Sequence, residues 1–331
     1  AGGGDLTFTV STDWYNQQYE YNGGGTGEAN NTTALDATSA IADYPDLTVE
    51  NLAVVSGAMQ SGGSVTVNWE VRNGGTAPTT GSFYDQVLVV NEDTGVTLVN
   101  SWIHHNFAVD GAIVAGGSHA RSHTFTLPEG LNGAGNLRVT VTADIGAALF
   151  EYNAGGTAEI NNSSELEVDS SLAPYPNLTL SDISAPASAL AGRPVTLSWT
   201  TTNTGDGIAS GNWYDQVFLS SDALVGGDIY LGTFYYAGNS INPGDAVTRS
   251  ETVTLPVTLA GNYRFVVRTD VSNALFELNN DDNVAVDGDT TNVGAALTLD
   301  VTPSSVGEAG GTATGTVTRA GDTGSAPLVN L

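Results

Sequence analysis

The chain has 331 residues, of which 36 are Asp or Glu and only 8 are basic, all of them Arg, giving a formal net charge of -28. This charge argues against nucleic acids and anionic membranes as partners, because both need a basic surface, and it favours cations. The absence of Cys excludes disulfides and thiolate metal sites, and no apolar stretch is long enough to span a membrane.

The first segment, residues 1–43, matches only the last part of a later one. Its DLTFTVSTDWYNQQYEYN aligns with GNLRVTVTADIGAALFEYN further along the chain. We therefore expect residues 1–43 to be the C-terminal part of a domain. Because the chain does not begin with Met, we also expect it to be a piece of a longer protein.

The next segment, residues 44–173, has the alternation of apolar and polar residues that is typical of β-strands. Val65, Val67 and Trp69 alternate with polar residues, and residues 137–141 show the same period of two. Turns rich in Gly, Asn and Pro separate about seven such strands, which predicts a two-sheet sandwich with Trp69 in its core.

Residues 174–294 repeat this pattern. SVTVNWEVRNGGTA and GSFYDQVLVV of the first copy correspond to PVTLSWTTTNTGDGIA and GNWYDQVFLS of the second. About 130 residues separate Trp69 from Trp199, which is the size of a whole domain rather than of one solenoid coil. The sequence therefore predicts a second sandwich, with Trp199 in its core.

The last segment, residues 295–331, departs from the repeat and predicts two new strands, at 297–301 and 312–318. A two-stranded piece is marginally stable alone. Both ends of the chain would then expose unpaired strand edges. We expect these edges to pair end to end with copies of the chain or with neighbouring domains.

The repeated segments YPDLTVENLAV, VTVNWEVRNGGT, FYDQVLV, HTFTLP and FEYN…EINN resemble the CARDB family, cell-adhesion-related domains found in bacteria. The resemblance extends from residue 1 to about residue 292, and the second copy is the closer match. LTLDVTPSSVGEAGGTATGTVTR resembles the opening strands of a Calx-beta domain. The resemblance implies an all-β chain of tandem immunoglobulin-like sandwiches, with partial domains at both ends, in a large secreted or surface-attached protein.

Three acidic loops form the main candidate site. Each has an Asp, a Glu, an Asn, a second acidic residue and a second Asn at matching positions, and the loops at residues 19–38 and 150–169 have no Lys or Arg nearby. Crowded carboxylates repel one another, and Ca²⁺ would relieve this because it takes 6–8 oxygen ligands. The alternative is that these side chains only stabilise turns. The candidate calcium ligands are Asp13, Glu20, Asn22, Glu28 and Asn30; Asp144, Glu151, Asn153, Glu159 and Asn161; and Asp270, Glu277, Asn279, Asp281 and Asn283.

Other candidates are weaker. Asp85 and Asp215 lie beside aromatic residues and could contact a sugar, although an Asp that binds a turn beside a packed Tyr is the simpler interpretation. His119 and His123 share one face of a predicted strand and could bind zinc, but the second copy has no His there. No sequence motif of a catalytic site is present, so we do not expect an enzyme.

The sequence thus favours a structural or adhesive repeat segment that forms an extracellular or cell-surface rod, fibre, filament or matrix, stiffened by Ca²⁺. The alternatives are a module that binds a glycan or a surface protein through its loops, and a non-catalytic spacer of a large exoenzyme. We expect neither nucleic-acid binding nor membrane insertion.

Overall fold

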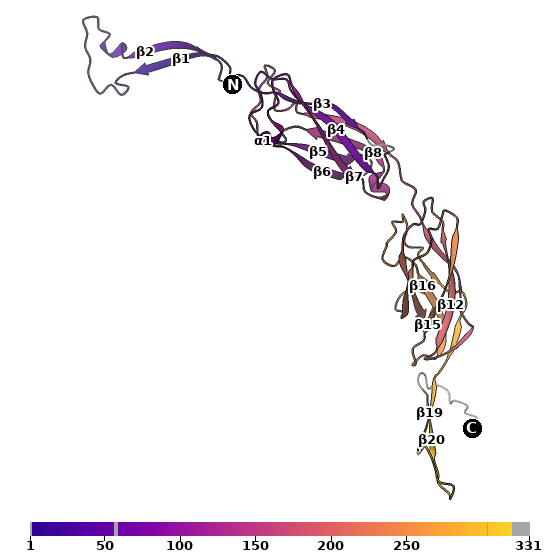
Figure 1. Cartoon of the computed structure of the whole chain (residues 1–331). Coiled ribbons are helices and arrows are strands. Elements are labelled where there is room, and N and C mark those ends of the chain that lie inside the picture. Colours follow the sequence, from indigo (N-terminus) through magenta and orange to yellow (C-terminus); the bar gives the residue numbers. More distant parts are fainter. Residues whose placement is uncertain (1, 56–58, 303, 320–331) are drawn as a thin grey trace. The chain divides into compact units, whose positions relative to one another are not determined.

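The structure is a computed structural model that describes residues 2–55, 59–302 and 304–319. The chain divides into two compact units, residues 1–172 and 173–331, which are described separately. Regular structure is almost entirely β, with strands paired into sheets, so the expected fold class is confirmed (Figure 1).

The first unit contains a two-stranded hairpin and a seven-stranded sandwich. The hairpin consists of β1 (Gly4–Ser11) and β2 (Thr32–Ser39), with a 3-10 turn at Gly27–Ala29 in its loop. One sheet of the sandwich has the order β3-β4-β7 and the other the order β6-β5-β8-β9. The strands of the sandwich are β3 (Leu47–Val54), β4 (Ser64–Asn73), β5 (Phe83–Asn91), β6 (Val96–His105), β7 (Ser118–Thr126), β8 (Gly135–Thr142) and β9 (Ser163–Ser170); the short helices are α1 (Phe107–Asp110) and a 3-10 turn at Gly130–Gly133.

The second unit has the same plan with additional short strands. Its smaller sheet has the order β10-β12-β15, and its larger sheet has the order β11-β18-β16-β13-β14, with β17 also paired to β16. A final hairpin lies where two strands were predicted. The strands are β10 (Leu178–Ser184), β11 (Ser188–Leu190), β12 (Pro194–Asn203), β13 (Trp213–Ser220), β14 (Ile229–Tyr236), β15 (Ala246–Thr254), β16 (Gly261–Arg268), β17 (Val284–Val286), β18 (Thr291–Gly294), β19 (Leu297–Thr302) and β20 (Thr314–Arg319).

The predicted core residues are buried between the sheets. Val65, Val67 and Trp69 on β4 are at most 1% exposed, and Trp199 of the second unit is fully buried. Each Trp removes about 200 Å² of largely apolar surface from water, so its burial is worth about 5 kcal/mol before conformational entropy is subtracted. The period-two interpretation of these strands is therefore confirmed.

A buried ion pair links the two sheets of the first sandwich. Asp85, on β5, is fully buried and accepts a hydrogen bond from the Trp69 indole on β4 at 2.9 Å. The Arg121 guanidinium, on β7, lies 3.2 Å from the same carboxylate. Three strands from both sheets thus meet at one carboxylate, and the interpretation of Asp85 as a turn-binding residue is wrong.

The second sandwich has an equivalent pair. Asp215, on β13, is fully buried, and its carboxylate accepts hydrogen bonds from Arg249 of β15 at 2.6 Å and from the Thr269 hydroxyl at 2.8 Å. Neither Asp215 nor its counterpart in the first sandwich is accessible to a sugar. Because buried charges are tolerated only when paired, this arrangement explains why the Asp recurs in both FYDQV and WYDQV.

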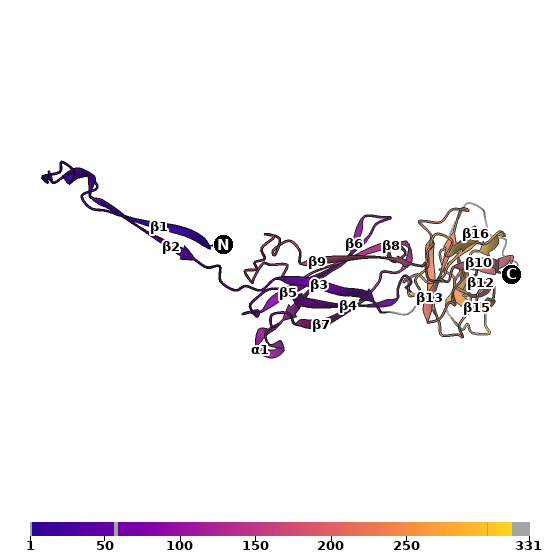
Figure 2. The ribbon, with the colours of Figure 1, turned by 90° about the horizontal axis from the view of Figure 1, so that it is seen from above.

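The hairpin β1–β2 has the same register as β8–β9. Adding 131 to each residue number converts the pair Gly4–Ser39 into Gly135–Ser170, and every other pair follows the same shift. The apolar face of β1, however, is uncovered: Phe8 is 56% exposed, whereas its counterpart Val139 is fully buried. Figure 2 shows β1 and β2 as a two-stranded ribbon.

Candidate functional site

The acidic loops begin with an Asp that holds a turn. Asp144 follows β8 with a φ of 42°, and its two carboxylate oxygens accept hydrogen bonds from the backbone amides of Ala148 and Leu149 at 2.9 and 2.8 Å. Asp13 and Asp270 have the same positive φ and each caps the corresponding pair of amides. The carboxylate of the first Asp in each loop therefore already accepts hydrogen bonds from backbone amides of the same loop.

The second carboxylate fixes the loop to the first strand of the sandwich. Glu151 is 3% exposed and accepts hydrogen bonds from the Leu47 backbone amide and from the Asn162 side chain, the latter at 2.9 Å. Its own amide donates to Glu159 at 2.8 Å. Burial in this position raises the pKa of Glu151 from 4.5 to about 7.

The second sandwich repeats this contact. Glu277 is 4% exposed, accepts hydrogen bonds from the Leu178 backbone amide and from Asn283, and has a pKa raised by burial. Asn283 is thus the structural counterpart of Asn162, not of Asn161 as the sequence spacing suggested. In the orientation that satisfies its neighbours, Asn31 makes the same contact to Glu20, at 2.8 Å.

A cluster that the sequence did not reveal lies beside each loop. In the first sandwich, Asp46 accepts hydrogen bonds from the side-chain amides of Asn153, at 3.2 Å, and Asn161, at 3.1 Å. In the second, the Asn177 amide donates to Asp282 at 2.9 Å. The repeated segments YPDL and YPNL, which place Asp46 and Asn177 at matching positions, are the signal that could have pointed to it.

Several side-chain oxygens of this cluster can accept a further hydrogen bond. The side-chain oxygen of Asn161 is buried and has no hydrogen-bond partner among the described residues, and the same is true of Asn177 Oδ1 and Asp282 Oδ1. Buried polar atoms without partners are uncommon in folded proteins. The cluster can therefore accept a further donor or a cation without losing any contact made by these atoms.

The structure brings together parts of each predicted ligand set. Glu159 contacts the Glu151 amide, Asn153 accepts from the Thr157 amide at 3.0 Å, and Asn22, Glu28 and Asn279 also bind local backbone. Over the described residues, no group of three or more Asp, Glu or His side chains is placed to hold a metal ion. Calcium binding thus stays a prediction, and every loop already has hydrogen bonds that stabilise it.

The two His residues considered for zinc have different neighbours. The His119 ring lies 5.2 Å from the His105 ring, edge to face, whereas the His123 ring lies 6.0 Å from Phe125. Burial lowers the pKa of both His105 and His123. In the part of the chain that the structure describes, no third ligand accompanies the pair.

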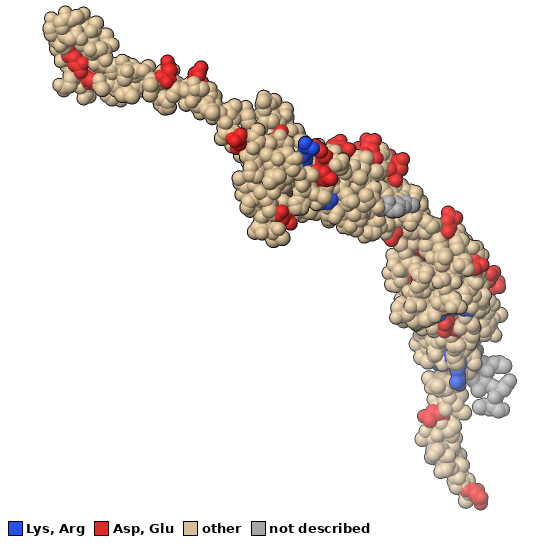
Figure 3. Space-filling model, turned by 45° about the horizontal axis from the view of Figure 1, so that its top comes forward, with Lys and Arg blue, Asp and Glu red and all other residues tan. Residues whose placement is uncertain are grey.

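Figure 3 shows acidic side chains as separate patches on both hairpins and both sandwiches, with few Arg residues on this face. In the described ranges, no helix has the length and apolar character needed to cross a bilayer.

A family model described as CARDB matches residues 175–287, within the second unit. No curated protein matches the chain.

Solved structures similar to parts of the chain include three examples. The crystal structure of a CARDB domain from Pyrococcus furiosus, in complex with di-metal ions, is 19% identical, with a TM-score of 0.28, and the match covers 37% of this chain and 96% of that one. Red sea bream transglutaminase is 14% identical over 78% of this chain and 32% of that chain (TM-score 0.25). A β-glucosidase from Listeria innocua in complex with glucose is 18% identical over 37% and 16% (TM-score 0.26).

Proposed function

We propose that the chain is a structural, adhesion-related segment of a larger extracellular or cell-surface protein, built from tandem CARDB-type sandwiches and without catalytic activity. The observation that carries this proposal is the buried Asp–Arg pair that joins the two sheets of both sandwiches. In a chain without Cys, such a pair takes the place that a disulfide holds in many secreted sandwiches. The buried charged groups of each sandwich thus connect its own two sheets.

The direct test of a structural role is mechanical. The whole chain is pulled from its two ends in a single-molecule force experiment. We expect two discrete unfolding events, each releasing about 450 Å of extended chain for a sandwich of roughly 125 residues. Gradual extension without discrete events would contradict the proposal, because a load-bearing module must resist force cooperatively.

We further propose that Ca²⁺ binds beside the acidic loops, at Asp46 and its two Asn neighbours. A 180° rotation of the Asn153 and Asn161 amides would place their oxygens where the nitrogens now face the carboxylate, 3.1–3.2 Å away. For Asn153 this rotation exchanges the hydrogen bond from the Thr157 amide for a calcium contact. The carboxylate and two amide oxygens then converge, and water and backbone carbonyls complete a calcium shell. Binding would stiffen this end of the first sandwich and add binding energy to its folding energy.

A thermal melt of the whole chain tests this proposal. With millimolar Ca²⁺ we expect a melting temperature several degrees above that in excess chelator, because extracellular modules bind Ca²⁺ with Kd values near 10⁻⁴–10⁻³ M. The same ionic strength of NaCl should not reproduce the shift. Asp46→Asn, which introduces the residue found at the matching position 177, should remove the shift of the first sandwich. Identical curves with Ca²⁺ and with chelator would reject the calcium site.

A further inference from the structure

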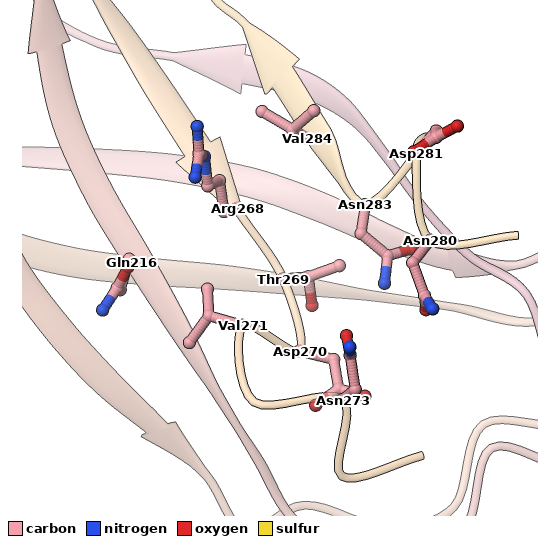
Figure 4. Close-up of a pocket in the computed structure, with 10 residues that line it drawn as sticks. All are labelled: Gln216, Arg268, Thr269, Asp270, Val271, Asn273, Asn280, Asp281, Asn283 and Val284. Carbon is pink, nitrogen blue, oxygen red and sulfur yellow. The ribbon is translucent and has the colours of Figure 1, made fainter. Parts of the chain in front are cut away.

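A polar pocket opens on the second sandwich, at the end where β13 and β16 meet the loops around residues 270 and 280. It has a volume of about 290 Å³. Figure 4 shows the side chains that surround it, and most of them can form hydrogen bonds. The lining includes Gln216, Arg268, Thr269, Asn273, Asn280 and Asn283.

Arg268 supplies the positively charged side chain of this lining. Within the described ranges, the Arg268 guanidinium forms no ion pair, although the chain contains 36 acidic residues. Its Cζ atom lies 5.4 Å from the centre of the Phe218 ring, which holds the side chain at the rim by a cation–π contact. An exposed guanidinium that lies over an aromatic ring and has no ion pair among the described residues is suited to a carboxylate brought by a ligand.

Both carboxylates of the lining are directed elsewhere. The Asp270 oxygens accept hydrogen bonds from the backbone amides of Ala274 and Leu275 at 2.8 and 2.9 Å, and the Asp281 carboxylate points away from the other labelled side chains in Figure 4. Asn283, in contrast, is 6% exposed, and its side-chain oxygen has no hydrogen-bond partner among the described residues. The lining therefore combines the Arg268 guanidinium with two carboxylates that are oriented toward other groups and with several side-chain amides, of which that of Asn283 is buried and has an oxygen able to accept a further hydrogen bond.

The corresponding pocket of the first sandwich lacks these features. Strand pairing places Thr142 opposite Gln86 where Arg268 lies opposite Gln216. This pocket is about 140 Å³ in volume and has Ala147 at its edge instead of Asn273. The turn that both sandwiches share explains why each has a pocket here. It does not explain why the pocket of the second sandwich contains Arg268 and Asn273 and has about twice the volume.

We propose that this pocket binds a uronic acid residue of a polysaccharide. The Arg268 guanidinium would pair with the sugar carboxylate. The side-chain amides of Gln216, Asn273 and Asn280 can each donate and accept hydrogen bonds, and the hydroxyl groups of a sugar can do the same. The pocket is close to the lower end of the usual size of ligand sites, which fits a single sugar ring. This inference goes beyond the proposed structural role and stands independently of it.

An aromatic pair lies next to the pocket on the same sheet face. Tyr214 precedes Gln216 by two residues on β13, so both side chains point outward, about 6.6 Å apart along the strand. The Tyr214 and Tyr235 rings are 5.0 Å apart and are 46% and 51% exposed. Exposed Tyr combines an apolar ring with a polar edge, which suits the face of a neighbouring sugar in the chain. The net charge of -28 repels polyanions, so isolated uronates among neutral sugars should be preferred.

The test is a titration of the whole chain with glucuronate, with glucose as the neutral counterpart, followed by calorimetry or by chemical-shift changes at about 0.15 M salt. We expect saturable binding of glucuronate and at least tenfold weaker binding of glucose. Arg268→Thr, which introduces the residue of the first sandwich, should weaken glucuronate binding at least about tenfold, since it removes a charged hydrogen-bond donor. The matched control is Arg193→Thr, an exposed Arg outside the pocket that should leave binding unchanged.

A second variant, Asn273→Ala, introduces the residue of the first pocket and should also weaken binding, so the result does not depend on one substitution that could disturb folding. Three outcomes would overturn the proposal: no saturable glucuronate binding, equal binding of glucose, or binding that both pocket variants leave unchanged. The force experiment above does not involve this pocket, so the two proposals fail separately.

Discussion

At the scale of single residues, burial decides what the acidic side chains do. Asp85 and Glu151 are both nearly inaccessible to water, and burial raises the pKa of Asp85 to about 6 and that of Glu151 to about 7. For Asp85, the ion pair with Arg121 offsets the free-energy cost of burying a charged carboxylate. Among the described residues, the hydrogen-bond donors to Glu151 are neutral, so ionisation at this position should cost more of the stability of the fold.

From the raised pKa of Glu151 we predict in which direction the stability of the first sandwich changes with pH. Between pH 4.5, where Glu ionises in an unfolded chain, and about 7, the folded protein retains a proton that the unfolded chain has lost. The free energy of unfolding of the first sandwich should then fall as pH rises through this window, by on the order of 2 kcal/mol. Glu151→Gln cannot ionise and should remove the part of this fall that Glu151 contributes, above all between pH 6 and 7, while the part due to Asp85, whose pKa is about 6, remains. The Gln carbonyl can still accept from the Leu47 amide.

Urea unfolding at several pH values measures this effect. Glu167→Gln, on the exposed side of β9, is the control and should leave the pH dependence of the wild type in place. If Glu151→Gln and the wild type lose stability in parallel between pH 4.5 and 7, the ionisation of Glu151 is not the cause.

At the scale of elements, the same hairpin occurs in two environments. Val139 on β8 is fully buried in the sandwich, whereas its counterpart Phe8 on β1 is 56% exposed. Val139→Ala should cost about 2 kcal/mol of unfolding free energy, because it leaves a cavity in the core. Phe8→Ala should change stability by less than about 0.5 kcal/mol. Chemical denaturation of both full-length variants compares them, and a similar loss for both would mean that the β1 face is covered in solution.

Strands and core were largely predictable from the sequence, because burial of one sheet face imposes a period of two that Val65, Val67 and Trp69 display directly. Contacts between segments that are distant in the sequence could not be predicted. Asp85 meets Arg121 only after β5 and β7 pack across the sandwich, and nothing in FYDQV indicates which residue will lie opposite. For this reason the sequence favoured a turn for Asp85, and the structure shows an ion pair.

The acidic loops were predicted as recurring units but not in their internal contacts. Counting residues matched Asn283 with Asn161, whereas the hydrogen bonds to Glu277 and Glu151 match it with Asn162, because the shorter loop of the second copy shifts the register. Asp46 lies about a hundred residues before its partner Asn153, so local spacing could not reveal their contact.

At the scale of the whole molecule, the chain carries two self-contained sandwiches. Each has its own buried Trp, its own Asp–Arg pair between the sheets and its own acidic loop closing one end. The net charge of -28 disfavours self-association without cations or specific contacts, which suits modules that are joined covalently along one chain.

Differential scanning calorimetry of the full chain and of Asp85→Asn tests this claim most directly. The substitution leaves Arg121 buried without a counter-charge, at a cost of about 3 kcal/mol. We predict two cooperative transitions in the wild type, of which Asp85→Asn lowers only the one that belongs to the first sandwich, by roughly 10 °C. A single transition that shifts as a whole, or two transitions that both move, would contradict the view that each sandwich carries its own stability.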